Sequence, residues 1–588
     1  MGSFRLFKEQ NSNFWRYFWK YSQVIILVEL LINFILVPTL NILTNWILML
    51  GGIKYVSYTN LLSIITKRPL VFIGLIMVLL LILLLVFSQF ALVLISFQAI
   101  KSKANMKWWD YLKTIFREIV SLPFRAFGFF LIYFLLITPF VGMGFSSNLL
   151  SKVKVPQFIM DWLFTEHLPW GITLVLVYII IFYIGMRWLF VLPLMIFDNR
   201  TIKNALHHSW RMTKGKTLYY LGAFVISFIV MSVISFAMFG IILAGQLGFD
   251  HVSVIQFPTA IINLTLVQLI NILSSLYATS ISTLIVLSQT KTQYIQTAHK
   301  NRSHKWFWIL LAAATIFSFV TYDTIYFKGW LMEPPVTISH RGVDDGNGVQ
   351  NSIPALEATS KEKPTYIEMD VQETKDHQYV VYHDNTLKGL AGINKRPSQM
   401  TLDELTQTQI HENDKTAYIA SFDDYLNTAT KLHQKLLVEF KSVKGNSNGF
   451  VTNFAKKYGA QLQKNGDMVH SLKYSYIEQS KKAMPKVAAN YILSFNLTGV
   501  PISDADGFTM EYSTLNSSFI DGSHALNKKV YAWTVNDSTD MSHMMFIDVD
   551  GIITDNLSDL KAEIKSNFSQ SGYAKRIYNY ILQMQSPF

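Results

Sequence analysis

The 588-residue chain contains no cysteine, and only 15% of its residues are charged. The absence of cysteine excludes disulfides, zinc–thiolate sites, iron–sulfur clusters and thiol nucleophiles. Soluble proteins carry about 25% charged residues, so a chain that is 51% hydrophobic lacks the polar surface of a simple soluble protein. The deficit lies in the first 330 residues, where apolar runs of about 20 to 30 residues recur. The sequence therefore predicts a multi-span membrane protein with a large soluble domain attached.

The apolar runs predict seven transmembrane helices, because each run is long enough as a helix to cross roughly 30 Å of hydrocarbon. They lie at residues 24–50, 70–99, 126–146, 169–197, 218–246, 258–288 and 306–323. The first run is too long for a cleaved signal peptide and lacks a small-residue cleavage site, so we expect it to remain as an anchor. Glu29 and Arg187 are the ionisable residues that stand out within these runs, and each either reaches the interface or faces a polar pocket or partner.

The basic residues predict the orientation of the chain. Arginine and lysine are concentrated before the first span and in the loops after the second, fourth and sixth spans. By the positive-inside rule these segments and the N-terminus are cytoplasmic, so the part that follows the seventh span is extracytoplasmic in a multi-pass cell-membrane protein. These loops account for the formal charge of +12, and no nucleic-acid motif is present, so nucleic acid is not an expected partner.

Four segments are predicted: an all-α membrane domain at 1–323, a juxtamembrane linker at 324–335, a soluble domain at 336–566 and an amphipathic tail at 567–588. The soluble domain alternates strand-like and helical runs, which predicts a parallel sheet and, at this length, an α/β fold of the (β/α)₈ TIM-barrel type. The expected strands are 336–340, 366–371, 379–383, 435–441, 468–472, 488–494, 529–536 and 551–554, with helices near 353–360, 422–432 and 449–463. The tail is expected to pack on the barrel.

Polar residues follow several of these strands, where a barrel of this type carries its chemistry. Glu368 and Asp370 are two residues apart and so share one strand face, and Glu439 supplies a third carboxylate. Three carboxylates in a chain without cysteine suggest a hard divalent cation, Ca²⁺ or Mg²⁺. His340 and His383 can exchange protons near neutral pH.

Arg341 and Lys441 add fixed positive charge at the same strand ends. Together with a cation and two imidazoles, this set suits phosphate-ester cleavage, in which one histidine deprotonates the nucleophile and the other protonates the leaving alkoxide. Trp533 either fills the core or forms an apolar wall against the substrate. Asp384 and Asp555 are expected to be caps or supporting groups.

The motifs resemble the glycerophosphodiester phosphodiesterase family over essentially all of 336–566. They are His340-Arg341-Gly342, Gln350-Asn351-Ser352, Ile367-Glu368-Met369-Asp370-Val371, Thr374-Lys375-Asp376, Val380-Val381-Tyr382-His383-Asp384, Leu437-Val438-Glu439-Phe440-Lys441, Ala532-Trp533-Thr534-Val535-Asn536 and Asp550-Gly551-Ile552-Ile553-Thr554-Asp555. Residues 187–193 and 205–215 resemble the signature of a membrane domain fused to bacterial members of this family.

The resemblance implies metal ligands at Glu368, Asp370 and Glu439, acid and base roles for His340 and His383, and phosphate contacts from Arg341 and Lys441. It also implies attack by the glycerol hydroxyl of the substrate through a cyclic phosphate, with release of glycerol 3-phosphate and an alcohol. Gln350 departs from the glutamate that is usual in the family and removes a charge beside Arg341. The residues 343–348 form an unusual loop that can reshape the substrate mouth.

Three functions remain open at this stage. The first is hydrolysis of glycerophosphodiesters, either deacylated phospholipid head groups or glycerol-phosphate polymers such as teichoic acids. The second is lysophospholipase D activity on a lysolipid. The third is a non-catalytic role in which the barrel is a scaffold and the membrane part is a transporter or assembly partner. The expected partners are such a substrate and membrane lipid, and the sequence does not indicate an oligomeric state.

Overall fold

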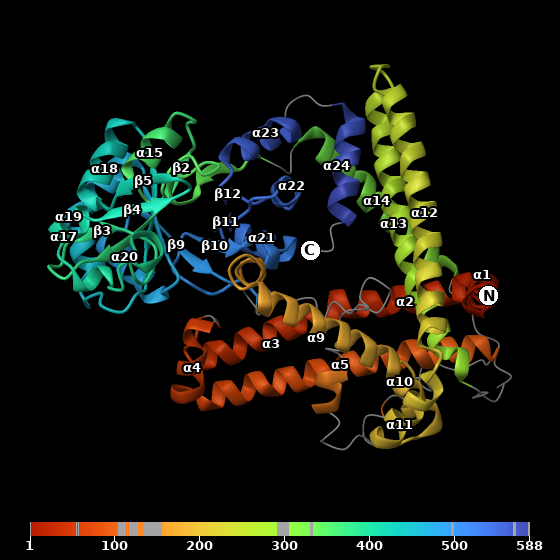
Figure 1. The fold of residues 1–588 in the computed structure, drawn as a ribbon. Helices are drawn as coiled ribbons and strands as arrows, with labels where there is room; N and C mark the ends of the chain where they lie inside the picture. Colours follow the sequence, from red (N-terminus) through yellow and green to blue (C-terminus); the bar gives the residue numbers. More distant parts are fainter. Residues whose placement is uncertain are drawn as a thin grey trace. The chain divides into compact units, whose positions relative to one another are not determined.

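The computed structural model describes residues 2–103, 156–290, 305–329, 333–495, 499–568 and 572–585, apart from 55 and 57. Within 104–155 it describes only 113, 116 and 128–133. The chain forms two compact units (Figure 1). The membrane unit comprises 1–51 and 68–324, and the barrel unit comprises 52–67 and 325–586. The segment 52–67, which includes α4 (Tyr58–Lys67), thus lies in the sequence of the membrane part but belongs to the barrel unit.

The described residues contain six helical segments long and apolar enough to span a membrane. They run over Phe18–Leu50, Pro69–Lys101, Leu168–Asp198, Thr217–Phe249, Gln256–Gln289 and Lys305–Lys328. These match six of the seven predicted spans, and most of the seventh, 126–146, lies outside the described residues. An additional helix, α1 (Gly2–Arg16), packs against α12 (Thr217–Phe249) and α13 (Gln256–Val286).

The first segment is not a uniform helix. It consists of α2 (Phe18–Leu31), a π-helical turn at Ile32–Leu36 and α3 (Val37–Leu50). A π-turn widens a helix locally and is often found at functional sites. Here the turn supplies two residues, Asn33 and Phe34, to a cavity of about 350 Å³ inside the membrane unit.

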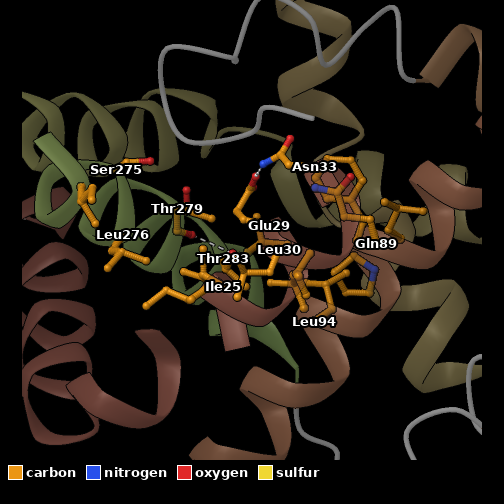
Figure 2. A pocket seen from close by; sticks show the side chains of 18 of the residues that line it. Ile25, Glu29, Leu30, Asn33, Gln89, Leu94, Ser275, Leu276, Thr279 and Thr283 are labelled. Carbon is orange, nitrogen blue, oxygen red and sulfur yellow. Dashed lines mark hydrogen bonds between the residues drawn. The ribbon is translucent and has the colours of Figure 1, made fainter. Parts of the chain in front are cut away.

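The cavity is mainly apolar, and Glu29 and Asn33 lie next to each other in it (Figure 2). Glu29 is the only charged residue among those that line it, and its carboxylate accepts a hydrogen bond of 3.2 Å from the Asn33 amide. Gln89 of α5 (Pro69–Lys101) and Thr279 and Thr283 of α13 add further polar atoms. Glu29 therefore faces a pocket that contains polar groups, as one of the two sequence interpretations proposed.

Arg187 plays a different, structural part. It ends α9 (Leu168–Arg187), is buried, and donates a hydrogen bond of 2.5 Å to the carbonyl of Trp210 in α11 (Ile202–Thr213). Its guanidinium also lies 4.5 Å from the centre of the Trp210 ring, while its carbonyl accepts a hydrogen bond from Ser209. The two halves of the membrane signature, 187–193 and 205–215, are thus joined by one arginine.

The barrel unit is built on eight parallel strands that close on themselves within the described residues. In spatial order they are β1 (Val336–Ser339), β12 (Gly551–Thr554), β11 (Lys529–Trp533), β10 (Gly507–Glu511), β9 (Ala488–Leu493), β8 (Met468–Ser471), β7 (Leu436–Phe440) and β2 (Tyr366–Glu373), and β2 pairs with β1. Continuous burial along β2, β7 and β12 is typical of parallel strands covered on both faces. The predicted TIM barrel is confirmed.

Helices cover the outside of the barrel (Figure 1). They are α15 (Ile353–Ser360), α18 (Phe422–Lys431), α19 (Phe450–Asn465), α20 (Tyr474–Ala483), α21 (Ser517–His524), α22 (Ser538–Phe546) and α23 (Leu557–Phe568). Local sequence sets where they begin: Ser352, Ser421 and Asn516 each accept a backbone hydrogen bond as the N-cap. Thr509 and Glu511 make β10 too polar to be recognised as a strand, and the sequence analysis missed it.

An insertion between β2 and β7 departs from a plain barrel. The strands β3 (Tyr379–Val381) and β6 (Ala420–Ser421) extend the sheet in the antiparallel sense, so the predicted strand at 379–383 is not a barrel strand. Between them lie the short helices α16 (Lys388–Ala391) and α17 (Leu402–Thr406) and the hairpin of β4 (Gln409–Glu412) and β5 (Lys415–Tyr418). Asn413, in the turn of this hairpin, donates a hydrogen bond to the carbonyl of Gly348.

The tail forms α24 (Tyr573–Gln585), which packs on α22. Tyr580 contacts Phe546, and His543 lies 3.0 Å from the side-chain oxygen of Gln583. Tyr326 and Phe327, which also belong to the barrel unit, contact Tyr580 and Tyr573 through their rings. The apolar face of the tail is therefore used for packing within the barrel unit.

Candidate active site

Strand register brings four buried side chains together inside the barrel. Asp370 of β2 is the register partner of Glu439 in β7, and Glu439 is the partner of His470 in β8. Glu368 lies two residues before Asp370 on the same strand face. One ligand atom from each of Glu368, Glu439 and His470 lies within 4.8 Å of the others. This group can hold a metal ion.

Asp370 lies beside this group but is held mainly by cations. Its carboxylate oxygens are 3.3 Å from Lys441 Nζ and 3.8 Å from Arg341 Nε. Asn351 donates a hydrogen bond of 2.8 Å to Asp370 Oδ2 and accepts one of 3.0 Å from the Asp370 backbone. Burial by itself raises the pKa of Asp370, but Lys441, His383 and Arg341 outweigh burial and hold that pKa well below its ordinary value. The carboxylate is therefore ionised.

Lys441 joins two of the carboxylates. Its ammonium lies 3.0 Å from Glu439 Oε1 as well as 3.3 Å from Asp370, and its side chain is almost fully buried. Burial lowers the pKa of this lysine, yet Glu439 and Asp370 raise it above its ordinary range. The site therefore contains a permanent cation among its acids.

The turn after β1 places Arg341 over the carboxylates. Arg341 has a left-handed backbone (φ 52°), and its N–H donates a hydrogen bond of 2.9 Å to Glu368 Oε2. Its guanidinium donates to Gln350 Oε1 at 2.5 Å. The Gln350 amide in turn donates to Glu412 at 2.5 Å, and the Gln350 backbone N–H donates to the same carboxylate at 2.8 Å. Gln350 is uncharged, so the negative charge in this hydrogen-bond chain comes from Glu412, which follows Gln350 in the chain.

His340 is oriented by a carboxylate. Its Nδ1 lies 2.8 Å from Asp555 Oδ1, and Asn536 donates a hydrogen bond of 2.7 Å to the other oxygen of Asp555. Burial raises the pKa of Asp555, but the charge and hydrogen bond of His340 outweigh burial and lower it to about 2. For His340, burial lowers the pKa, but Asp555 and Glu368 raise it above the ordinary value. Asp555 therefore favours the imidazolium form of His340.

His383 has a similar partner, its own neighbour. The His383 Nδ1 atom lies 2.8 Å from Asp384 Oδ1, and this hydrogen bond lowers the pKa of Asp384. The loop is fixed by Gln372, whose amide donates to the carbonyl oxygens of Tyr382, His383 and Asp384 at 2.8–3.1 Å. One ring nitrogen of each histidine is thus held by a carboxylate.

Trp533 ends β11 and is partly buried against the interior cluster of Ile338, Leu437, Met468, Tyr531 and Ile553. Its indole N–H donates a hydrogen bond of 3.2 Å to the carbonyl of Thr509. The ring is fixed, and the part that remains exposed is available to a substrate.

The donor set fits a divalent metal. His470 Nε2 is buried and has no hydrogen-bond partner among the described residues, and the carboxylates of Glu368 and Glu439 are next to it. Glu368, Glu439 and His470 would hold the ion. A divalent cation bound there supplies charge stabilisation for a phosphoryl oxygen.

The sequence analysis did not name His470, Glu412 or Gln372, whose side chains contribute to the site. His470 was included only as part of a predicted strand. A histidine in a buried strand next to the Glu439 strand was the available signal, because parallel neighbours bring such residues into one plane. Asp384 and Asp555 were expected only as caps or supporting groups, and the structure places both on the histidines.

A parallel barrel with buried acids, two carboxylate-held histidines and paired cations at its strand ends, linked to a polytopic helical unit, defines a membrane-bound phosphodiesterase. The family model "Membrane domain of glycerophosphoryl diester phosphodiesterase" matches residues 7–323, and "Glycerophosphoryl diester phosphodiesterase family" matches 340–447 and 500–558. The first match covers more than half of the chain. The chain belongs to the membrane-domain-containing glycerophosphoryl diester phosphodiesterases.

Individual relatives match about two fifths of the chain. YhdW of Bacillus subtilis, which bears a glycerophosphodiester phosphodiesterase name, is 25% identical over 227 residues, 37% of this chain and 93% of the relative. A glycerophosphodiester phosphodiesterase of Caldanaerobacter subterraneus is 25% identical over 242 residues, with the same coverage. An Oleispira antarctica phosphodiesterase solved with sn-glycerol-3-phosphate is 19% identical, with 40% of this chain and 97% of that chain covered and a TM-score of 0.35.

We expect Asp555→Asn to change the pH dependence of catalysis. If His340 is the proton donor, activity is present while it is protonated and is lost as the pH rises through its pKa. Removal of the Asp555 charge lowers that pKa, so the alkaline limb of the kcat/KM profile moves to lower pH. The control is Asp384→Asn, which removes the partner of His383 and leaves the position of the alkaline limb unchanged. An unshifted limb in Asp555→Asn contradicts the assignment.

Proposed function

We propose that the chain hydrolyses glycerophosphodiesters to glycerol 3-phosphate and an alcohol, with a bound divalent cation and two histidines as proton carriers. The observation that carries the proposal is the pair of histidines, each held by a carboxylate, beside a group of acids that can bind a metal. The substrates are either deacylated phospholipid head groups or glycerol-phosphate polymers such as teichoic acids. The Oleispira relative was solved with sn-glycerol-3-phosphate, which is the product proposed for this chain.

The contacts of the side chains support the following roles. Arg341 and Lys441 bind the non-bridging oxygens of the phosphate and stabilise the charge that develops there. His383 accepts the proton of the glycerol hydroxyl as its oxygen attacks phosphorus. His340, whose protonated form Asp555 favours, gives a proton to the alcohol oxygen as the bond from that oxygen to phosphorus breaks. Water then opens the cyclic phosphate with the two proton transfers reversed.

An assay of the detergent-purified full chain tests this proposal. Release of glycerol 3-phosphate from glycerophosphodiesters, of lysophosphatidic acid from a lysophospholipid and of glycerol 3-phosphate from polyglycerol phosphate is measured with and without a divalent cation. Cation-dependent release from the first or third substrate supports the proposal. Release from the lysophospholipid alone supports the lysophospholipase D alternative, and no release from any of them supports the scaffold alternative.

The orientation is a second part of the proposal: the N-terminus is cytoplasmic and the barrel is extracytoplasmic. The segment 52–67 follows the first span and belongs to the barrel unit, where Lys54 lies 3.3 Å from Glu478 and 3.0 Å from Asp504. Its position requires an even number of crossings between it and the barrel. Five described candidate spans lie in between, and the predicted span at 126–146 makes six. The parity supports seven spans in all.

Single cysteines in this cysteine-free chain test the orientation. Tyr418 in the hairpin is 57% exposed and Leu62 in α4 is 73% exposed. We expect Tyr418→Cys and Leu62→Cys to react with a membrane-impermeant maleimide on intact cells. Lys214→Cys, in a predicted cytoplasmic loop, should react only after permeabilisation. Labelling of Lys214→Cys, but not of Tyr418→Cys, on intact cells reverses the proposed orientation.

A further inference from the structure

His470 occupies a position that packing alone does not explain. It lies in β8, is only 2% exposed, and points toward the acids of the neighbouring strands. Its Nδ1 is 3.4 Å from the Thr509 hydroxyl, which fixes the ring. Its Nε2 lies 3.5 Å from Glu368 Oε1 and makes no hydrogen bond to a described residue. A buried imidazole nitrogen is normally hydrogen-bonded, so this one is available as a ligand.

The arrangement has the parts of a histidine metal ligand. Metal-binding histidines commonly hold their second nitrogen in a hydrogen bond, which orients the ring and fixes its tautomer. Thr509 is in that position for His470. The free nitrogen lies with one oxygen of Glu368 and one of Glu439 in a group whose members are within 4.8 Å of one another. Asp370 lies outside this group of three, and its carboxylate contacts Lys441, Arg341 and Asn351.

We propose that His470 is a metal ligand of this chain, with Glu368 and Glu439, and that the site prefers a divalent transition metal such as Mn²⁺, Co²⁺ or Zn²⁺ to Ca²⁺ and Mg²⁺. An imidazole nitrogen suits the transition metals, whereas Ca²⁺ and Mg²⁺ prefer oxygen ligands. The inference modifies the all-oxygen set of Glu368, Asp370 and Glu439 expected from the sequence. It rests on the proposed function only in assuming that the barrel binds a cation.

Metal binding by the detergent-purified full chain tests the inference without reference to activity. The protein is stripped with EDTA, desalted, and titrated with Mn²⁺, Co²⁺, Mg²⁺ and Ca²⁺. We expect His470→Ala to weaken Mn²⁺ and Co²⁺ binding about 10- to 100-fold and to change Mg²⁺ and Ca²⁺ binding much less. Electron spin-echo modulation of the stoichiometric Mn²⁺ complex should show coupling to a ¹⁴N nucleus, which disappears in the variant.

Two variants separate the specific effect from misfolding. His377→Ala removes a histidine whose side chain is 70% exposed in the same barrel unit, and it should bind metals as the wild type does. His470→Gln keeps a polar side chain of similar reach but offers an amide oxygen, and it should shift the preference toward Mg²⁺ and Ca²⁺. Unchanged Co²⁺ affinity in a folded His470→Ala, or a Mn²⁺ complex of the wild type without ¹⁴N coupling, overturns the inference.

The metal titration also keeps this inference apart from the proposed function. If the wild-type chain binds Mn²⁺ through a nitrogen ligand but releases no glycerol 3-phosphate, the metal-site inference stands and the proposed function fails. If the wild-type chain releases glycerol 3-phosphate with Ca²⁺ and the His470→Ala variant binds cations as the wild type does, the proposed function stands and the metal-site inference fails.

Discussion

Replacement of His340 by alanine is expected to reduce glycerol 3-phosphate release by a factor of about 10³, within the range for loss of a general acid or base. The imidazole is held by Asp555, and no other histidine has that partner among the described residues. The measurement is kcat/KM with a glycerophosphodiester at a saturating cation concentration. His377→Ala serves as the control, because it removes an exposed histidine that contacts Glu373, outside the group of candidate catalytic residues.

A change of leaving group distinguishes proton donation from a structural role for His340. A p-nitrophenyl ester of glycerol phosphate has a leaving group that departs without a proton. The rate loss in His340→Ala should therefore be much smaller with this ester than with a natural alcohol. Equal losses with both substrates mean that the histidine does not act as the acid, and a residual activity above one tenth with the natural diester means that it is not essential.

Replacement of Lys441 by methionine is expected to damage both stability and catalysis. The substitution leaves Glu439 and Asp370 buried without their shared cation. Loss of one member of a buried ion pair costs about 3–5 kcal/mol, which corresponds to a fall of roughly 10 °C in the unfolding midpoint of a domain of this size. Loss of the proposed phosphate contact should lower kcat by a factor of about 10². Thermal unfolding of the EDTA-treated chain and steady-state kinetics measure the two effects.

Two matched variants test the reason for this effect. Lys441→Arg keeps a cation and should recover most of the stability. Lys457→Met removes the ion pair between Lys457 and Asp423, in which the lysine side chain is 43% exposed. This substitution should lower the free energy of unfolding by less than about 1 kcal/mol. If Lys441→Met unfolds at the same temperature as Lys457→Met, the lysine does not neutralise the acids in the way that the distances indicate.

Features set by local spacing were predictable from the sequence. The two-residue separation of Glu368 and Asp370 placed both on one strand face, and the apolar runs identified six spans that the structure describes. The alternation of strands and helices predicted the barrel even though β10 was missed, since seven of its eight strands carry a clear apolar pattern. In these cases each pattern reflects a single element and its burial.

Features set by tertiary pairing were not predictable from the sequence. The His340 and Asp555 contact joins residues 215 positions apart, and the Gln350 and Glu412 contact joins residues 62 apart. Neither separation follows a repeat or a helical period. The other residues of β8 have no titratable side chain, so only the register with β7 reveals that His470 faces Glu439.

The assignment of 52–67 to the barrel unit has a consequence for the order of folding. This segment leaves the ribosome more than 480 residues before the last barrel strand, Gly551–Thr554, so it has no native partner during most of synthesis. The contact of Lys54 with Glu478 and Asp504 spans 424 and 450 positions, and loop closure over such a distance is entropically costly until the intervening chain is in place. The segment 52–67 therefore docks late, after the rest of the barrel unit has folded. A newly made chain with a folded barrel and an undocked segment is the expected last intermediate, and a protease site inserted near Leu62 would reveal it.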